Sequence, residues 1–450
     1  MDYRLTEQER ALAARCLETA LAKGAQKARV TLNKSCMDLI GTLNGEVDKV
    51  SRCLDRSISI ALFVDGKYGS FSINRLEESA LEDFIDKAIA TARLLAEDRL
   101  RDLPDPARTA KDAAGGRELG LYDEACPKMD SERRLAIALG ASIFKDTAPT
   151  EEWTLVSEEA EYSDSVFDTL VMDTQGLYCR HTETSFEYGV EMTITDKEGN
   201  KYSGYWWNVC PRLAGLGAEG ICDRALSRAV SQIGPRSLRS GKYTCVIDSE
   251  CSSKLVTPLL NALGAYAVQQ NNSFLCGKLG EKVFHEGLTI RDMCRNKGES
   301  GSRLFDSEGV ATTEHDIISN GVVNEYFINT YMAGKMQMAP TVEDATRPRV
   351  MPWPEPGLDR GAIMARCGDG ILVTGFNGGN SNAATGDYSF GIEGFAFKDG
   401  RKTHPVREML MTGNLVELWN NLLAAGDDSR PCKSKLIPTL AFGNVDFSGE

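Results

Sequence analysis

The chain has 450 residues, 42% of them hydrophobic, and a chain of this length is expected to form two or three domains. Its 51 basic and 65 acidic residues give a formal net charge of -14, which disfavours nonspecific nucleic-acid binding because that binding depends on Lys and Arg. No apolar run approaches the roughly 18 residues of a membrane-spanning helix, and the start of the chain lacks the layout of a secretory signal. We therefore expect a cytoplasmic protein that contacts neither a membrane nor nucleic acid directly.

Residues 1–110 are predicted to form a first unit of one helix, three strands and a second helix. Thr6 and Glu9 have the spacing of a capping box, and apolar residues then recur at helical period until Gly24. Strand-like segments follow at residues 30–43, 57–64 and 68–73, the last two separated by the hairpin signal Asp65-Gly66. A helix with one apolar face is expected over residues 81–95. The following stretch, which contains Pro104, Pro106, Gly115 and Gly116, is interpreted as a linker.

Residues 111–235 repeat the same order of elements. A helix is predicted over residues 129–145, followed by strand-like runs at 153–162, 165–172 and 184–195, a strand near 205–207 and a helix over 218–233. This repetition indicates a weak internal duplication, so the two units are expected to form one N-terminal domain.

Residues 236–450 are predicted to form a β-rich C-terminal domain. A helix at residues 256–269 interrupts it early, and Asn320-Gly321 and Asp399-Gly400 are hairpin signals. The segment 340–356 holds five of the fifteen prolines and is expected to be a long surface connection. The expected fold class is α+β, with an N-terminal α/β region built from a duplicated helix–antiparallel strands–helix unit and a β-rich C-terminal domain.

Side chains suited to catalysis are few. Of the four histidines, only His285 precedes a glutamate, and Thr289 and Ile290 stand where a helical zinc motif would need its second histidine. No nucleophile elbow or phosphate-binding loop is present. Asp306 and Glu308 lie two residues apart, which on a strand would point both carboxylates to one side, although a solvated acidic turn is the simpler interpretation.

An ordered series of motifs nevertheless resembles the TldD/PmbA peptidase family, which also carries the label modulator of DNA gyrase. The motifs are FDSEGVAT at 305–312, ISNGVV at 318–323, TGDYS at 385–389, HPV at 404–406 and TGNL at 412–415. Gly45-Glu46-Val47, Arg56 and Gly69-Ser70 extend the resemblance into the N-terminal part. The motifs and their chemistry single out candidate substrate-binding residues, namely Asp306, Glu308, Gly309, Gly386 and Asp387.

The resemblance implies a specific difference from the zinc-bearing members of that family. TldD-type chains carry His-Glu-x-x-x-His on a helix and complete the zinc site with a later cysteine. Here the best register places Leu260, Asn261 and Ala265 at the positions of the first His, the Glu and the second His. Cys432 lies near the position of the family cysteine and is a remnant ligand at most. We therefore expect no catalytic residues, metal or cofactor on this chain, and zinc on a TldD-type partner.

The pattern is similar to the PmbA kind of subunit, also called TldE. This similarity implies a non-catalytic partner in a heteromeric peptidase that cuts small or unfolded polypeptides, with a homodimer left open when the chain is alone. Two alternatives belong to other classes. One is a self-sufficient hydrolase that uses Asp306, Glu308, His285 or Cys432, and the other is a peptide-binding adaptor with no peptidase partner.

Overall fold

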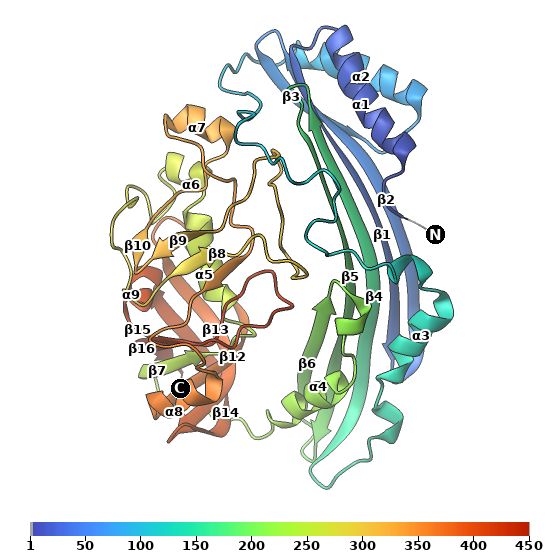
Figure 1. Ribbon diagram of the computed structural model, residues 1–450. Helices are drawn as coiled ribbons and strands as arrows, with labels where there is room; N and C mark the ends of the chain where they lie inside the picture. Colours follow the sequence, from blue (N-terminus) through green and yellow to red (C-terminus); the bar gives the residue numbers. More distant parts are fainter. Residues whose placement is uncertain (1–2, 450) are drawn as a thin grey trace. The chain divides into compact units, whose positions relative to one another are not determined.

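The structure is a computed structural model that describes residues 3–449 (Figure 1). The chain forms two compact units. The first contains the residues up to Val230 together with Arg295–Thr312 and Ala333–Lys335, and the second contains Ser231–Cys294, Thr313–Met332 and the residues from Met336 onward. Each unit is built around its own β-structure.

The first unit has the predicted duplication. One half runs α1 (Glu7–Ala22), β1 (Lys27–Leu43), β2 (Glu46–Val64), β3 (Lys67–Ile73) and α2 (Glu78–Ala92). The other runs α3 (Ser131–Gly140), β4 (Trp153–Asp173), β5 (Tyr178–Asp196), β6 (Lys201–Cys210) and α4 (Ile221–Val230), with short 3-10 turns at Cys126–Lys128, Phe144–Asp146 and Leu213–Gly215. All six strands form one antiparallel sheet of order β3-β2-β1-β4-β5-β6, so the two halves meet where β1 pairs with β4. The duplicated helix–strands–helix order is therefore confirmed.

The sheet has two different faces. Alternate side chains of β1, such as Val30 and Leu32, are buried with apolar residues of α1 and α2, and we call this side the helix face. Thr31, Asn33 and Ser35 alternate with them and lie on the other side, which we call the open face. The helix that starts the unit is fixed by the predicted capping box, in which the Thr6 side chain accepts from the Glu9 N–H and Glu9 accepts from the Thr6 N–H.

The stretch expected to be a linker is instead packed against the open face. Ala110, Ala113, Leu119 and Leu121 form an apolar cluster with residues of β4 and β5 and with Leu304 and Phe305 of the returning segment. Gly116 also forms a bridge to His181 of β5. Prolines and glycines mark irregular backbone, but they do not show whether the apolar residues between them are buried.

Several strands are longer than expected. We predicted two strands at 153–162 and 165–172, but β4 is continuous from Trp153 to Asp173. The apparent interruption is Asp164, a carboxylate on the helix face that is 2% exposed. It remains in the strand because Arg134 of α3 binds both of its oxygens, with Nε–Oδ2 and Nη2–Oδ1 distances of 2.6 and 2.8 Å.

The second unit contains a closed β-structure. Its large sheet has the order β14-β13-β12-β7-β16-β15, and a further pairing of β14 with β16 closes it into a barrel. The strands are β7 (Gly241–Ile247), β12 (Gly370–Ser381), β13 (Asp387–Lys398), β14 (Arg401–Asn414), β15 (Leu422–Ala425) and β16 (Leu440–Ser448). On one face of this sheet, Val246, Leu372, Phe395 and Ala441 form an apolar cluster with Ile363 and Met364 of helix α8 (Arg360–Cys367). The β-rich character of this part is confirmed.

A small sheet of order β10-β9-β8-β11 and several short helices complete the chain. The strands are β8 (Ile290–Asp292), β9 (His315–Ser319), β10 (Val322–Val323) and β11 (Pro348–Val350), and the helices are α5 (Ser253–Ala262), α6 (Ala265–Gln269), α7 (Thr330–Met336), α8 (Arg360–Cys367) and α9 (Leu415–Asn420). The proline-rich segment 340–356 is not a simple surface connection, because it contains β11, which pairs with β8, and the fully buried side chain of Arg347.

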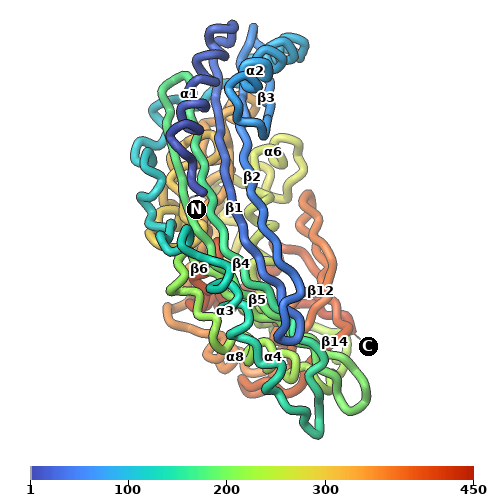
Figure 2. The backbone as a smooth tube through the Cα atoms, turned by 90° about the vertical axis from the view of Figure 1, so that its right-hand side faces the viewer, coloured from blue at the N-terminus to red at the C-terminus, as the bar shows by residue number. Residues whose placement is uncertain are grey.

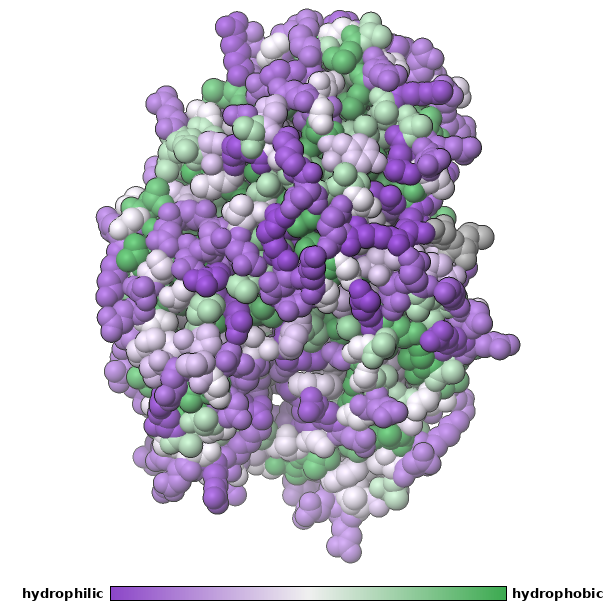
Figure 3. All heavy atoms as spheres, viewed as in Figure 1, coloured by the Kyte–Doolittle hydropathy of each residue, from purple (hydrophilic) through white to green (hydrophobic). Residues whose placement is uncertain are grey.

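Among residues 3–449, none of the helices has the length and apolar content needed to cross a membrane. The face in Figure 3 is largely hydrophilic, with apolar side chains in small separated groups. This distribution agrees with the high content of charged residues in the sequence.

Candidate functional site

The helix that would carry a zinc motif is broken in this chain. We expected one helix over residues 256–269, but α5 ends at Ala262 and α6 begins at Ala265. Between them, the Ala265 N–H donates to the carbonyl of Phe327, and the Phe327 N–H donates to the carbonyl of Leu263. The backbone at the break is therefore held by strand-like pairing with a distant segment, a long-range contact that local helical periodicity does not reveal.

The three positions of the degenerate motif lie on both sides of this break. Leu260 and Ala265 are buried, at 4% and 3% exposure, whereas Asn261 is exposed. Zinc in proteins is held by imidazole nitrogen, thiolate sulfur or carboxylate oxygen. Neither buried hydrocarbon side chain has a donor atom, so these three residues do not fit a zinc ion.

Other metal-ligating side chains do not replace them. Within residues 3–449, no three His, Cys, Asp or Glu side chains are grouped so that they could hold a metal ion. Cys432 is partly exposed and lies between Arg430 and Lys433, which both form ion pairs with Glu250. His285 accepts a hydrogen bond at Nδ1 from the Gly287 N–H at 3.0 Å and packs edge-on against Trp353.

The acidic motif near residue 306 forms a tight turn in the first unit. Asp306 Oδ1 accepts hydrogen bonds from the N–H groups of Glu308 and Val310, both at 2.9 Å. Gly309 has a φ of +83°, and a Cβ there would lie 2.4 Å from a methyl carbon of Leu177. The carbonyl of Gly309 accepts from the Ala110 N–H at 3.0 Å. The geometry gives this candidate binding motif a role in holding the segment 295–312 on the first unit.

The C-terminal motifs TGDYS and TGNL come together in the second unit. In the β13–β14 pairing, Asp387 lies opposite Asn414. Asn414 Nδ2 donates to Asp387 Oδ1 and to the Thr385 carbonyl, both at 2.9 Å, and Thr385 Oγ1 donates to Asp387 Oδ2 at 2.7 Å. These hydrogen bonds, that of Asn414 first, lower the pKa of Asp387. Gly386, with a φ of +80°, forms the adjacent turn.

Next to this turn lies a small cavity of about 250 Å³. It is lined by polar and charged residues, including Lys242, Asn414, Glu417 and Asp446. The candidate residues thus fall into two groups: Asp306, Glu308 and Gly309 share a turn in the first unit, whereas Gly386 and Asp387 share a turn in the second.

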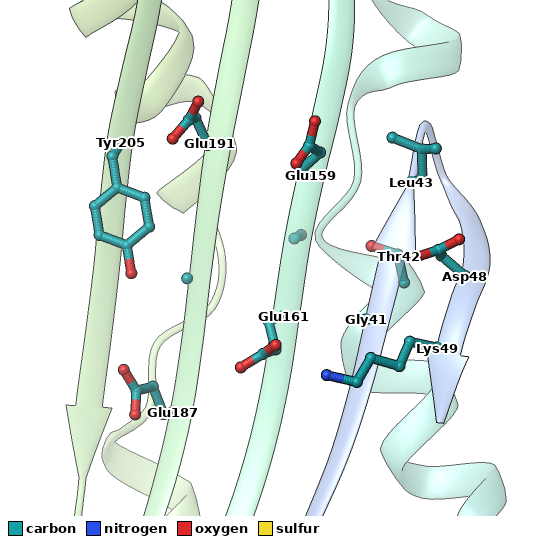
Figure 4. A pocket seen from close by; sticks show the side chains of 12 residues that line it. Gly41, Thr42, Leu43, Asp48, Lys49, Glu159, Glu161, Glu187, Glu191 and Tyr205 are labelled. Atoms are coloured by element: carbon teal, nitrogen blue, oxygen red, sulfur yellow. The ribbon is translucent and has the colours of Figure 1, made fainter. Parts of the chain in front are cut away.

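A larger groove on the open face of the first unit was not predicted. It has a volume of about 500 Å³ and is lined by Glu159 and Glu161 of β4 and by Glu187 and Glu191 of β5. Figure 4 shows Lys49 of β2 extending across β1 toward Glu161 of β4. Burial and the neighbouring charge of Glu161 raise the pKa of Glu187. The spacing of two or four residues between glutamates on the same strand was the available sequence signal.

A histidine–glutamate pair was also missed. His315 begins β9, its Nδ1 lies 2.7 Å from the Thr313 carbonyl, and its Nε2 contacts the carboxylate of Glu325. The hydrogen bond with Glu325 raises the pKa of His315 to about 9. Asp292, whose own pKa is raised by burial, adds a second nearby carboxyl group. No local pattern in the sequence indicates the contact between His315 and Glu325.

Comparison with known proteins defines the class to which this architecture belongs. Models described as PmbA/TldA metallopeptidase domain 1, central domain and C-terminal domain match residues 28–92, 124–233 and 240–449. A duplicated sheet unit followed by a β-barrel unit is thus the architecture of a metallopeptidase-related protein. The chain belongs to the PmbA/TldD family.

The similarity to individual proteins extends over the whole chain. A crystal structure from Bacteroides thetaiotaomicron VPI-5482 with the modulator-of-DNA-gyrase label is 37% identical, with a TM-score of 0.93, and the match covers 99% of this chain and 100% of that one. Metalloprotease PmbA of Escherichia coli O157:H7 is 26% identical over 447 residues, 96% of each chain. TldE from Thermococcus kodakarensis shares the fold, with 19% identity, a TM-score of 0.82 and coverage of 97% of this chain and 100% of that one.

Proposed function

We propose that this chain is the TldE-type subunit of a two-chain metallopeptidase and that a TldD-type chain supplies the zinc and the general base. The observation that carries the proposal is the broken α5–α6 segment, where Leu260, Asn261 and Ala265 occupy the motif positions. The proposed role of the complex is proteolysis of small or unfolded polypeptides in the cytoplasm.

The chemical requirements of the reaction support assigning the zinc and the general base to the TldD-type chain. Zinc-assisted peptide hydrolysis requires a metal that activates a water molecule and a base that takes the proton of that water. A buried Leu260 and a buried Ala265 cannot coordinate a metal, and the neutral amide of Asn261 is not a base near pH 7. Cys432 alone supplies one of the three or four ligands that a zinc ion takes.

In the proposed complex, this chain would contribute a surface that binds the substrate and no catalytic residues. In the second unit the β14–β16 pairing closes the barrel, and β15 remains at the end of the sheet. The open face of the first unit carries polar residues and the glutamate-lined groove. We assign to this face the role of a binding surface for an extended polypeptide before it is cleaved.

The competing function is peptidase activity of this chain alone, a candidate because the Escherichia coli relative carries the name metalloprotease. Two measurements separate the candidates. The first is the zinc content of the purified chain by elemental analysis, for the native sequence and for Cys432→Ser. We expect substoichiometric zinc in both, whereas near-equimolar zinc that the replacement removes would contradict the proposal.

The second measurement is cleavage of an unfolded polypeptide by this chain, by a TldD-type chain from the same cell, and by the mixture. We expect cleavage by the mixture only, and its loss when the motif glutamate of the TldD-type chain is changed to glutamine. Cleavage by this chain alone that a chelator blocks would establish the competing function.

A further inference from the structure

The cavity beside the TGNL segment lies where two strands of the barrel separate. β14 and β16 pair at three positions, the last of which joins Thr412 to Asp446, and Figure 2 shows β14 beside the C-terminal end of the chain. Beyond this pair the register of β16 with β7 shifts between Phe442 and Val445, while β14 continues into α9. The space that this leaves has a volume of about 250 Å³. The mouth of a barrel is one of the places where proteins bind small molecules.

A buried tyrosine reaches this cavity with its hydroxyl group. Tyr388 lies opposite Gly413 in the β13–β14 pairing and is 6% exposed. A Cβ at Gly413 would lie 3.1 Å from Tyr388 Oη, so the glycine leaves the hydroxyl open to the cavity that both residues line. Within residues 3–449, no group forms a hydrogen bond with this hydroxyl. A buried polar group without a partner is uncommon, and a ligand in the cavity would supply the partner.

The protonation state of Tyr388 decides which groups it can bind. Burial, followed by the neighbouring acidic groups of Cys245, Asp446 and Glu417, raises the pKa of Tyr388 above its ordinary value near 10. The hydroxyl therefore keeps its proton at neutral pH. It can donate one hydrogen bond to an anionic group of a ligand.

The rest of the lining carries charges of both signs and a small apolar surface. Lys242 and Asp446 form an ion pair, with 3.3 Å between Nζ and Oδ2. Glu417 of α9 adds a second carboxylate, with which no cation forms an ion pair in the described chain. Leu418 and Val445, at 4% and 3% exposure, supply the apolar surface. A ligand that matches this lining has a positive group, a negative group and a short hydrocarbon side chain.

We propose that this cavity binds a free α-amino acid with a small aliphatic side chain. The ammonium group of the amino acid lies against Glu417, and its carboxylate accepts hydrogen bonds from the Tyr388 hydroxyl and from Lys242. Its side chain packs on Leu418 and Val445. A metal cation fits less well because Lys242 would repel it, and an anion without an ammonium group would be repelled by two carboxylates.

The proposed site is independent of the proposed function. It uses no residue of α5 or α6 and requires no TldD-type chain, so either proposal can fail without the other.

Calorimetric titration of the dialysed full-length chain tests the class of ligand. Glycine, L-alanine, L-valine and L-leucine are titrated separately, and we expect at least one to bind with a dissociation constant below about 1 mM. The amino acid that binds most tightly is then compared with its amide, which lacks the carboxylate, and with its N-acetyl derivative, which lacks the ammonium group. We expect each derivative to bind at least about tenfold more weakly, because hydrogen bonds to charged groups are the strong ones.

Two conservative variants test the position of the site. Tyr388→Phe removes only the hydroxyl and should weaken binding about threefold to tenfold, and Glu417→Gln removes the charge that holds the ammonium group and should weaken it about tenfold or more. Glu393→Gln is the matched control, because Glu393 is an exposed carboxylate of β13 outside the cavity lining. This control should bind the amino acid as the native chain does.

The results decide the proposal in either direction. Binding that both variants weaken and the control retains supports it. Absence of binding for all four amino acids at about 10 mM, ten times the expected limit, would overturn it. So would a derivative that binds as tightly as its parent, or binding that either Tyr388→Phe or Glu417→Gln leaves unchanged. A circular-dichroism spectrum and urea midpoint equal to native in each variant confirm that the fold is intact.

Discussion

At the scale of single residues, His315 has a raised pKa and Gly309 has a positive φ angle. His315 is held by Glu325, and the first consequence concerns pH. Its pKa in the folded chain is about 9, above the usual 6.5, so folding favours the protonated form. The resulting stabilisation is fully present below about pH 6.5 and is lost as the pH rises through about 9.

Replacing either member of this pair should therefore have a pH-dependent cost. We expect His315→Gln or Glu325→Gln to lower the unfolding free energy of the second unit at pH 6 by on the order of 2–3 kcal/mol, since one pKa unit corresponds to about 1.4 kcal/mol. The difference from the native chain should shrink above pH 9. Urea unfolding at several pH values measures it, and Glu314→Gln, in an exposed neighbour, is the control. A difference that does not vary with pH would contradict the assignment.

Gly309 tests whether the acidic motif has a structural role. Gly309→Ala would strain the positive φ and drive a methyl group into Leu177, so the segment 295–312 should lose protection from hydrogen exchange. Gly298→Ala is a matched control in the same segment, because Gly298 has a φ of +75° but nothing within 4 Å of an added Cβ. We expect the Gly309 variant to be the less stable by about 1–3 kcal/mol. Equal effects would favour a role other than packing.

At the scale of elements, α3 depends on one buried ion-pair network. Arg134 of this helix is 5% exposed and contacts Asp164 of β4 and Asp38 of β1, the latter at 3.0 Å. Tyr162 also donates to Asp164, at 3.1 Å. The network fixes the helix to two strands of the sheet and allows polar residues to remain inside them.

Breaking this network should be costly. We expect Arg134→Leu to destabilise the first unit by about 3–5 kcal/mol, because it leaves the buried carboxylate of Asp164 without its cation. Arg133→Leu, at the exposed neighbouring position of the same helix, should cost under about 1 kcal/mol. Denaturant unfolding followed by hydrogen exchange in α3 compares the two. A small loss in the Arg134 variant would mean that Tyr162 and backbone groups satisfy Asp164 unaided.

At the scale of the whole molecule, each compact unit is built from several non-contiguous segments of the chain. The first unit includes Arg295–Thr312, and Leu304 and Phe305 of that segment are buried in its apolar cluster. A fragment of residues 1–235 therefore lacks part of its own core, although it contains the entire six-stranded sheet.

Such a fragment should be measurably weaker than the same residues in the intact chain. We expect a loss of roughly 3–6 kcal/mol, because each fully buried side chain of this size contributes about 1.5–3 kcal/mol, and increased binding of a hydrophobic dye. Adding a peptide of residues 295–312 should reverse part of both effects, and the same peptide with Phe305→Ala is the control. A fragment as stable as the intact unit would show that the segment adds nothing.

Much of this organisation was readable from the sequence because it is local. The capping box at Thr6, the hairpin turns at Asp65-Gly66 and Asp399-Gly400, and the repeated helix–strands–helix order all depend on residues close together in the chain. The ordered motifs indicated the family for the same reason. Side-chain periods of 2 and 3.6 residues are properties of the sequence itself.

Tertiary structure alone decided the long-range features. The pairing of β1 with β4, the closure of the barrel by β14 and β16, the helix break at Gly264 and the contact between His315 and Glu325 each join residues that lie apart in the chain. The two predicted strands at 153–162 and 165–172 are one strand, because Asp164 between them is paired with Arg134 of a different element. Local patterns in the sequence specify which element forms. Packing, burial and charge compensation depend on which elements come into contact, and local patterns do not specify those contacts.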